Sequence, residues 1–310
     1  MAAPLLLATS LPADEAAAWR DALARAMPGE AVETVAAERA AVEIAVVANP
    51  VPGALRDLPA LRWVHSLWAG VDGLLRDETL PNVPVVRLVD PALARAMAET
   101  VAAAVLHLHR DLHTYAAQQR RREWRQHAAR PAAERRVSVL GLGEMGRAAA
   151  GLLLVLGFPV RGWSRSGRGV AGIETFAGAD GLDAALDGAE ILVNALPLTD
   201  VTRGILNRRS FRRLAPGACL VNVGRGAHLV EADLRGALGA GRIGHAVLDV
   251  FDQEPLPGDH PFWSHSGVTI LPHVAAPTSM ASAAAIVAHA VAAYRATGQV
   301  PAGVDRARGD

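Results

Sequence analysis

Three side chains in the second half of this 310-residue chain could together bind and protonate a carboxylate-bearing molecule: Arg225, Glu254 and His273. Each follows an apolar run that we predict to be a β-strand, at residues 218–223, 246–250 and 268–271. In open α/β sheets, ligands bind outside the carboxyl ends of the strands, so the three should share one edge. There the guanidinium could hold the carboxylate, while the glutamate orients an imidazole that moves a proton.

A glycine-rich loop further upstream predicts a dinucleotide site. Residues 137–140 read as a strand, and Gly141, Gly143 and Gly146 follow it before a helix. Gly141 permits a tight turn, Gly143 lets the backbone approach a pyrophosphate, and Gly146 allows close helix packing. The helix N-terminus offers free N–H groups to the phosphates. The same spacing recurs at 239–244 after a helix, where we predict a helix C-terminal turn.

The end of the next predicted strand distinguishes the two nicotinamide cofactors. NAD-specific sites carry an acidic residue there, roughly 20 residues beyond the glycine loop, which binds the ribose 2′-hydroxyl. This chain has Ser164 at that position, with Arg165 and Arg168 nearby. Because a hydroxyl and guanidinium groups suit a 2′-phosphate, we predict a preference for NADPH over NADH.

Composition excludes several other functions. Acidic and basic residues number 31 each, and every basic residue is arginine, so lysine Schiff-base chemistry and a Walker A loop are impossible. The single cysteine, Cys219, excludes an intramolecular disulfide and a Cys-based zinc cluster. His109 and His113 lie four apart on a helix predicted over 91–122, but no carboxylate or thiol completes a metal site. Balanced charge and the lack of a membrane-length apolar run predict a cytoplasmic protein without nucleic-acid or membrane partners.

Strands and helices alternate along the chain in two series, which predicts parallel sheets covered by helices. The first series has predicted strands at 5–8, 42–47, 62–67 and 83–88, with a helix at 14–27. The second begins near residue 135 and has predicted strands at 137–140, 160–163, 191–195, 218–223, 246–250 and 268–271. A last helix is predicted at 280–294.

In their order, these motifs resemble the D-isomer-specific 2-hydroxyacid dehydrogenase family over nearly the whole chain. The resemblance rests on the glycine loop, Asn-x-x-Arg-Gly at 222–226, Asp-Val-Phe-x-x-Glu-Pro at 249–255 and Pro-His at 272–273. Segments 176–178, 273–276 and 304–309 are similar to the glyoxylate/hydroxypyruvate reductase A subgroup. The resemblance implies a Rossmann-type doubly wound parallel sheet, residues 97–279, inserted into a smaller flavodoxin-like α/β substrate domain, residues 1–96 and 280–310.

The resemblance also implies a reaction: NADPH-dependent reduction of a small 2-oxoacid such as glyoxylate or hydroxypyruvate. His273 would donate the proton, and Glu254 would hydrogen-bond the imidazole and raise its pKa. Arg225 would bind the substrate carboxylate and polarise the ketone.

Further roles come from the same resemblance. A homodimer is implied, in which Trp124 reaches the neighbouring subunit's site or packs in the dimer contact. Trp68, Ala69 and Gly70 look like the substrate-carboxylate loop. The implied cofactor-binding residues, in addition to the three glycines and the loop after residue 163, are Glu144, Met145, Leu196, Pro197, Thr202, Val223 and Asp249, the last as a partner of the nicotinamide amide.

One departure from the family bears on the substrate. Ser279 stands where many relatives carry an arginine that binds the polar end of the substrate, and Trp68 would narrow the pocket. Both features favour a small substrate such as glyoxylate. Two alternatives stay open: a reductase of bulkier 2-oxoacids, of the phenylpyruvate or 2-oxoisocaproate type, and a dinucleotide-sensing binding protein similar to a corepressor.

Overall fold

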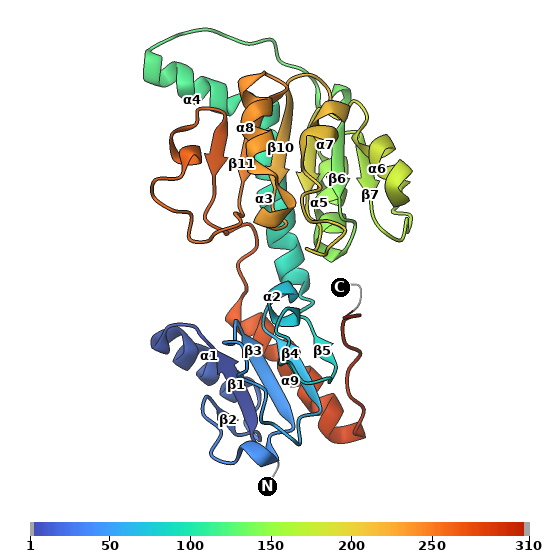
Figure 1. Ribbon diagram of the computed structural model, residues 1–310. Coiled ribbons are helices and arrows are strands. Elements are labelled where there is room, and N and C mark those ends of the chain that lie inside the picture. The colour runs from blue at the N-terminus through green and yellow to red at the C-terminus, as the bar shows by residue number, and fades with distance from the viewer. Residues whose placement is uncertain (1–2, 307–310) are drawn as a thin grey trace. The chain divides into compact units, whose positions relative to one another are not determined.

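The computed structural model describes residues 3–306, which form two compact units (Figure 1). Unit 1 comprises Met1–Ala92 and Thr278–Asp310, and unit 2 comprises Leu93–Pro277. Residues 307–309 of the terminal segment used in the family resemblance lie outside the described residues. No helix among residues 3–306 is long and apolar enough to cross a membrane.

Unit 1 contains a five-stranded parallel sheet with the strand order β2-β1-β3-β4-β5, the flavodoxin-like order. Its strands are β1 (Leu5–Thr9), β2 (Val32–Glu33), β3 (Ile44–Ala48), β4 (Trp63–Ser66) and β5 (Val85–Val86). Its helices are α1 (Ala13–Ala26), α2 (Asp72–Leu75) and α9 (Met280–Thr297), with a 3-10 turn at Arg39–Ala41. Every residue of β3 is buried, as expected of a central parallel strand covered on both faces.

The C-terminal helix α9 belongs to unit 1 although unit 2 precedes it in the sequence (Figure 1, red). Arg295 near its end binds Glu30 through Nε (3.0 Å) and Glu43 through Nη1 (2.7 Å). The ring of Tyr294 meets Trp63 of β4 edge-on, with the centroids 6.0 Å apart. Ion pairs and ring packing therefore join the two parts of unit 1.

Unit 2 contains a seven-stranded parallel sheet with the order β12-β11-β10-β9-β6-β7-β8. Its strands are β6 (Val137–Leu140), β7 (Val160–Trp163), β8 (Glu174–Phe176), β9 (Ile191–Asn194), β10 (Ala218–Asn222), β11 (Ile243–Leu248) and β12 (Val268–Ile270). Its helices are α3 (Pro91–His109, beginning at the last residues of unit 1), α4 (Leu112–Arg121), α5 (Glu144–Val155), α6 (Gly178–Leu186), α7 (Arg208–Arg213) and α8 (Glu231–Gly239). The first strand lies inside the sheet and the order reverses between β6 and β9, which confirms the predicted Rossmann-type sheet.

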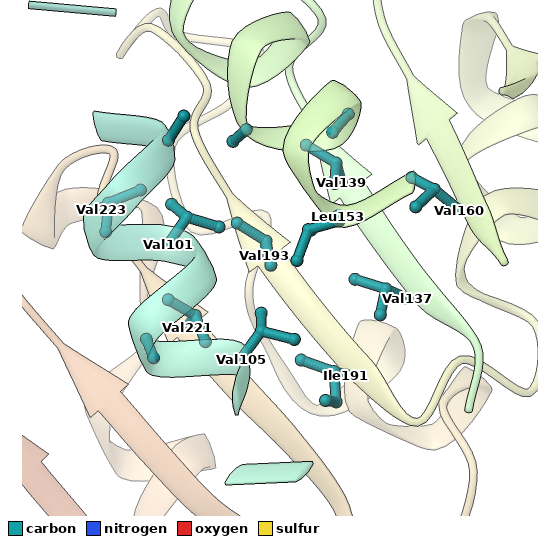
Figure 2. Close-up of a cluster of buried hydrophobic side chains, with 14 of the residues drawn as sticks. Val101, Val105, Val137, Val139, Leu153, Val160, Ile191, Val193, Val221 and Val223 are labelled. Atoms are coloured by element: carbon teal, nitrogen blue, oxygen red, sulfur yellow. The ribbon is translucent and has the colours of Figure 1, made fainter. Parts of the chain in front are cut away.

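Aliphatic side chains from helices α3 and α5 cover one face of this sheet (Figure 2). Val137 and Val139 of β6 point to the same face because side chains alternate along a strand, and there they join Leu153 of α5 and Val101 of α3. A separate buried cluster covers the opposite face. Both faces are apolar, and each fully buried Val or Leu contributes roughly 1.5–3 kcal/mol, which holds the strand ends in place.

The prediction of one continuous helix over 91–122 is wrong, because the segment forms two helices. The chain leaves α3 at His109 and enters α4 at Leu112, with Asp111 in the left-handed region at φ 54°. Aspartate tolerates this conformation better than most residues. His109 and His113 therefore do not share a helix face.

The short strands β2 and β8 were not predicted, because two or three residues carry no recognisable alternation.

Candidate active site

The glycine-rich loop leads from β6 into α5 at the point where the strand order reverses. Gly141 has φ +93°, and a Cβ on Gly146 would lie 1.7 Å from the carbonyl oxygen of Gly141, so only glycine fits there. Gly143 is the exposed N-cap of α5 and has no side chain to occupy the first N–H groups of the helix. Glu144 and Met145 form the first turn. This arrangement fits a pyrophosphate bound at the helix N-terminus.

Ser164 directly follows β7, and its N–H donates to the carbonyl of Phe176 at the end of the neighbouring strand β8 (3.1 Å). Its hydroxyl is buried and has no hydrogen-bond partner within residues 3–306. Arg165 and Arg168 are exposed in the same loop, which contains no acidic residue up to Gly172. An unpartnered hydroxyl beside two guanidinium groups fits a 2′-phosphate.

The loop after β9 is shaped by Thr202. Its hydroxyl donates to the carbonyl of Pro197 (2.8 Å) and accepts the N–H of Thr199 (2.9 Å). Leu196 and, after β10, Val223 are buried side chains. Thr202 therefore stabilises the conformation of the loop that begins at the carboxyl end of β9.

The predicted histidine and glutamate meet directly. His273 Nδ1 donates to Glu254 Oε2 at 2.7 Å, and Glu254 Oε1 accepts the N–H of Phe251 at 2.9 Å. The backbone of His273 is left-handed (φ 55°), and its N–H donates to the carbonyl of Asp249 (2.9 Å). The His273 side chain is 53% exposed, with Nε2 as the ring nitrogen not bound to Glu254. The carboxylate thus fixes the ring and leaves the second nitrogen for a ligand.

The electrostatics of this pair favour the charged forms of both residues. The hydrogen bond to Glu254 raises the pKa of His273, against the opposing effects of partial burial and the positive charge of Arg225. Partial burial alone would raise the pKa of Glu254, but the hydrogen bonds from His273 and from the Phe251 N–H outweigh it, so this pKa is lowered. The pair thus favours the protonated imidazole, the form that can donate a proton.

Arg225 lies on the turn after β10, beside the strand that leads to Glu254. Its Nη1 donates to the carbonyl of Gly224 (2.8 Å). A Cβ on Gly226 would lie 1.8 Å from the carbonyl carbon of Phe251, so the arginine turn packs directly against the glutamate loop. Because β10, β11 and β12 are neighbours, the turns after them bring the three predicted residues to one edge.

A buried polar network beneath Arg225 was not predicted. Asn194 Nδ2 donates to Asn222 Oδ1 (2.8 Å) and lies 2.9 Å from His228 Nδ1, which accepts the N–H of Arg225 (3.1 Å). His228 Nε2 lies 3.2 Å from the carbonyl of Pro197, which can only accept, so Nε2 carries the proton. The network links the loop after β9 to the arginine turn. The available signal was an asparagine at the end of two successive apolar strands.

Asp249 is almost fully buried, and its carboxylate accepts the N–H groups of Val274 (2.7 Å) and Ala275 (3.1 Å). These bonds hold the segment that follows His273. The nicotinamide role assigned to Asp249 from the sequence stays a prediction, and positioning of the histidine is an additional role that the structure reveals.

Three predicted substrate residues belong to unit 1. Trp68, Ala69 and Gly70 form the turn between β4 and α2. Ser279 is the N-cap of α9, and its hydroxyl accepts the N–H of Ser282 (3.4 Å). Trp124, in the segment after α4 in unit 2, is 97% exposed.

A cluster of histidines in unit 2 lies on α3, α4 and β11. The His113 ring lies 5.8 Å from that of His107 and 4.2 Å from that of His245, between centroids. His245 Nε2 is 2.8 Å from Thr269 Oγ1. Burial lowers the pKa of all three and takes that of His245 to about 3. Within residues 3–306, no group of three or more His, Cys, Asp or Glu side chains is arranged to hold a metal ion.

The second Gly-x-Gly-x-x-Gly match has the predicted structure. Helix α8 ends at Gly239, and Gly241 (φ +67°) turns the chain toward β11. This match is a helix C-terminal turn, as predicted.

A doubly wound sheet, a glycine loop at its switch point and an imidazole–carboxylate pair at the carboxyl edge define a nicotinamide-dependent dehydrogenase. Residues 102–275 match the family described as "D-isomer specific 2-hydroxyacid dehydrogenase, NAD binding domain". The chain belongs to the D-isomer specific 2-hydroxyacid dehydrogenase family, which confirms the resemblance drawn from the motifs.

Named relatives support the same family. A protein of Serratia proteamaculans (strain 568) named glyoxylate/hydroxypyruvate reductase A is 44% identical over 268 residues, covering 84% of this chain and 85% of the relative. The structure of a D-isomer specific 2-hydroxyacid dehydrogenase from Xanthobacter autotrophicus Py2, in complex with NADPH and MES, has a TM-score of 0.94 at 38% identity over 100% of both chains. An NADPH-dependent glyoxylate/hydroxypyruvate reductase from Sinorhizobium meliloti, in complex with NADP and sulfate, has a TM-score of 0.91 at 36% identity, covering 99% of this chain and 100% of that one.

Proposed function

We propose that this protein is an NADPH-dependent reductase that converts a small 2-oxoacid, glyoxylate or hydroxypyruvate, to the 2-hydroxyacid. The observation that carries the proposal is the His273–Glu254 hydrogen bond of 2.7 Å, beside the Arg225 turn, at the carboxyl edge of a dinucleotide-binding sheet. The names of the Serratia and Sinorhizobium relatives support the substrate class.

In the proposed reaction a nicotinamide cofactor, when bound, would supply the hydride for the keto carbon. Negative charge then develops on the carbonyl oxygen, and His273 Nε2 donates a proton to it. Glu254 stabilises the imidazolium before the transfer and holds the ring through Nδ1. Arg225 binds the substrate carboxylate and polarises the ketone with its planar guanidinium.

The proposed cofactor site lies in unit 2, within residues 97–279. Gly141, Gly143, Glu144, Met145 and Gly146 would hold the pyrophosphate. Ser164, Arg165 and Arg168 would bind the 2′-phosphate, and the NADPH and NADP complexes named for the Xanthobacter and Sinorhizobium proteins support that preference. The nicotinamide and its ribose would contact the remaining predicted residues, Leu196, Pro197, Thr202, Val223 and Asp249.

The proposed substrate domain comprises residues 1–96 and 280–310, where the N–H groups of Ala69 and Gly70 would bind the carboxylate and Trp68 would line the pocket. The proposal includes a homodimer in which Trp124, 97% exposed in the single chain and so available for a contact, reaches the partner. Light scattering after gel filtration tests the dimer. The cytoplasmic location stays a prediction.

The experiment that tests the function follows the loss of NADPH or NADH absorbance with glyoxylate, hydroxypyruvate, pyruvate and phenylpyruvate. Fast turnover of the first two with NADPH supports the proposal. Turnover of phenylpyruvate alone would keep the mechanism and favour the reductase of bulkier 2-oxoacids. Tight NADPH binding without turnover of any of the four would overturn the proposal in favour of a dinucleotide sensor.

A further inference from the structure

His228 binds both backbone polar groups of Arg225. Arg225 lies directly before the 3-10 turn Gly226–His228. The ring Nδ1 of His228 accepts the N–H of Arg225 (3.1 Å), and the backbone N–H of His228 donates to the carbonyl of Arg225 (3.2 Å). His228 is 0% exposed, so these contacts lie inside unit 2. One buried residue thus restrains the backbone that carries the guanidinium.

The hydrogen bonds of the His228 ring require one neutral form of the imidazole. Two donors meet at Nδ1, the N–H of Arg225 and the Nδ2 amide of Asn194 (2.9 Å), so Nδ1 carries no proton. Nε2 carries the proton and donates to the carbonyl of Pro197 (3.2 Å). Each ring nitrogen therefore has a partner of the right kind. A buried polar network that is satisfied in this way is rigid and specifies one arrangement.

The backbone next to Arg225 leaves room for this ring. A Cβ on Gly224 would lie 2.9 Å from His228 Nδ1 and 2.8 Å from Asn194 Nδ2, which is closer than such atoms pack. Glycine at position 224 therefore gives the imidazole and the amide their space beside the strand end. In addition, Asn222, the last residue of β10, donates through Nδ2 to the carbonyl of Arg225 (3.2 Å). Two buried side chains thus hold the backbone of Arg225.

The two ring nitrogens of His228 serve different parts of the site. The carbonyl that Nε2 reaches, that of Pro197, also accepts the hydroxyl of Thr202 (2.8 Å), so the loop after β9 keeps a donor if His228 is replaced. Nδ1 accepts from Arg225, the residue that the proposed function places on the substrate carboxylate. Loss of Nδ1 should therefore impair substrate binding, whereas loss of Nε2 should be tolerated.

We propose that His228 is a positioning residue for substrate binding: by accepting the Arg225 N–H at Nδ1, it fixes the turn from which the guanidinium reaches the substrate carboxylate. The inference rests on the proposed function, which assigns that carboxylate to a 2-oxoacid. His228 acts through Arg225 and does not itself touch the substrate, because it is fully buried. Since displacing a group by about 1 Å can lower a reaction rate about 100-fold, loss of this restraint should be measurable.

The test uses two substitutions that keep different halves of the ring. In His228→Asn the amide lies where Nδ1 lay and can still accept the Arg225 N–H, whereas in His228→Gln the amide lies where Nε2 lay. We expect His228→Gln to lower kcat/KM for glyoxylate about 10- to 100-fold and His228→Asn to stay within about threefold. The Kd for oxamate, an unreactive 2-oxoacid analogue titrated into the NADPH-loaded protein, should rise in His228→Gln in the same way. The Kd for NADPH should stay within about twofold in both, because Thr202 still holds the Pro197 carbonyl.

His245→Gln is the matched control, because it also replaces a buried histidine of unit 2. Its ring contacts His113 and Thr269. We expect this variant to leave kcat/KM for glyoxylate and the Kd for oxamate within about twofold. Circular dichroism shows that each variant is folded at the assay temperature. If His228→Gln is unfolded there, 3-thienylalanine at position 228 repeats the test, because it keeps a five-membered ring and lacks the Nδ1 acceptor.

Near-normal kcat/KM and oxamate affinity in His228→Gln would overturn the inference. Equal losses in His228→Gln and His228→Asn, or an equal loss in His245→Gln, would also overturn it, because a histidine that only stabilises the fold gives these results. Failure of the proposed function would instead appear in the unmodified protein, as neither oxamate binding nor turnover of glyoxylate, and would overturn the inference with it.

Discussion

Mild acid should destabilise unit 2 through its buried histidines, and His245→Gln should remove a measurable part of this effect. His245 lies inside the sheet on β11, where its Nε2 contacts Thr269 Oγ1. Glutamine can keep a hydrogen bond to Thr269 but cannot take up a proton near neutral pH. The perturbation therefore removes one titrating group and preserves the polar contact.

The magnitude follows from the pKa of His245 in the folded and unfolded chains. Burial, together with repulsion by His113, His107 and His265, lowers the pKa of His245 from 6.5 to about 3 in the folded protein. Between these values the unfolded chain binds more protons, so the free energy of unfolding falls as the pH falls below 6.5. From about pH 7.5 to about pH 5.5, His245 alone should lower it by about 1.4 kcal/mol.

The assay is guanidinium-induced unfolding followed by circular dichroism at both pH values. The unmodified protein should lose about 1.4 kcal/mol more than His245→Gln over this interval. His107 and His113 remain in both proteins, so their contribution largely cancels in the difference. Equal pH dependence of the two proteins would show that His245 is protonated in the folded state and would refute the reasoning.

Four substitutions test the site. His273→Gln should lower kcat roughly 100- to 10,000-fold with the Kd for NADPH unchanged, and near-normal kcat would exclude His273 as the proton donor. Because the pKa of His273 is raised by Glu254 and reduction requires its protonated form, activity should fall as the pH rises through that pKa. In Glu254→Gln the fall should come at lower pH, and an unchanged pH–rate profile would contradict the assigned role. Ser164→Asp should shift the ratio of kcat/KM for NADPH over NADH toward NADH by roughly 10- to 100-fold, whereas an unchanged ratio would remove Ser164 from the 2′-phosphate site. Trp68→Ala should raise kcat/KM for phenylpyruvate relative to glyoxylate about 10-fold, and a constant ratio would mean that the indole does not limit substrate size.

The position of the candidate triad could be predicted because it depends on strand order. Arg225, Glu254 and His273 each follow a recognisable apolar run, and β10, β11 and β12 are neighbours in the sheet. The glycine loop could be predicted as well. Gly146 lies so close to the carbonyl of Gly141 that only glycine fits, and this contact fixes the spacing between the two glycines. Backbone topology and close contacts leave local signals that a single sequence carries.

Features that depend on single dihedral angles or on long-range side-chain contacts left no such signal. The apolar spacing continues past residue 111, whereas the break between α3 and α4 coincides with the left-handed backbone of Asp111. The hydrogen bond from the Val274 N–H to the Asp249 carboxylate joins residues 25 positions apart. It depends on a loop conformation that residue spacing does not predict. The sequence also could not predict that the indole nitrogen of Trp68 is buried without an acceptor among residues 3–306. The absence of an acceptor is evident only from the positions of the neighbouring residues.

The attachment of α9 to unit 1 has a consequence for synthesis of the protein on the ribosome. The buried residues of α9, Ala283, Ala284, Val287 and Val291, reach the unit 1 sheet only after all of unit 2 has been translated. The ion pairs of Glu30 and Glu43 with Arg295 can likewise form only after Arg295 has been translated. Domains fold as units during translation, so unit 2, which is continuous in sequence, can complete its core first. The N-terminal segment is translated first but finishes folding last. Until α9 is translated, the apolar face of the unit 1 sheet that this helix covers is exposed and could bind chaperones.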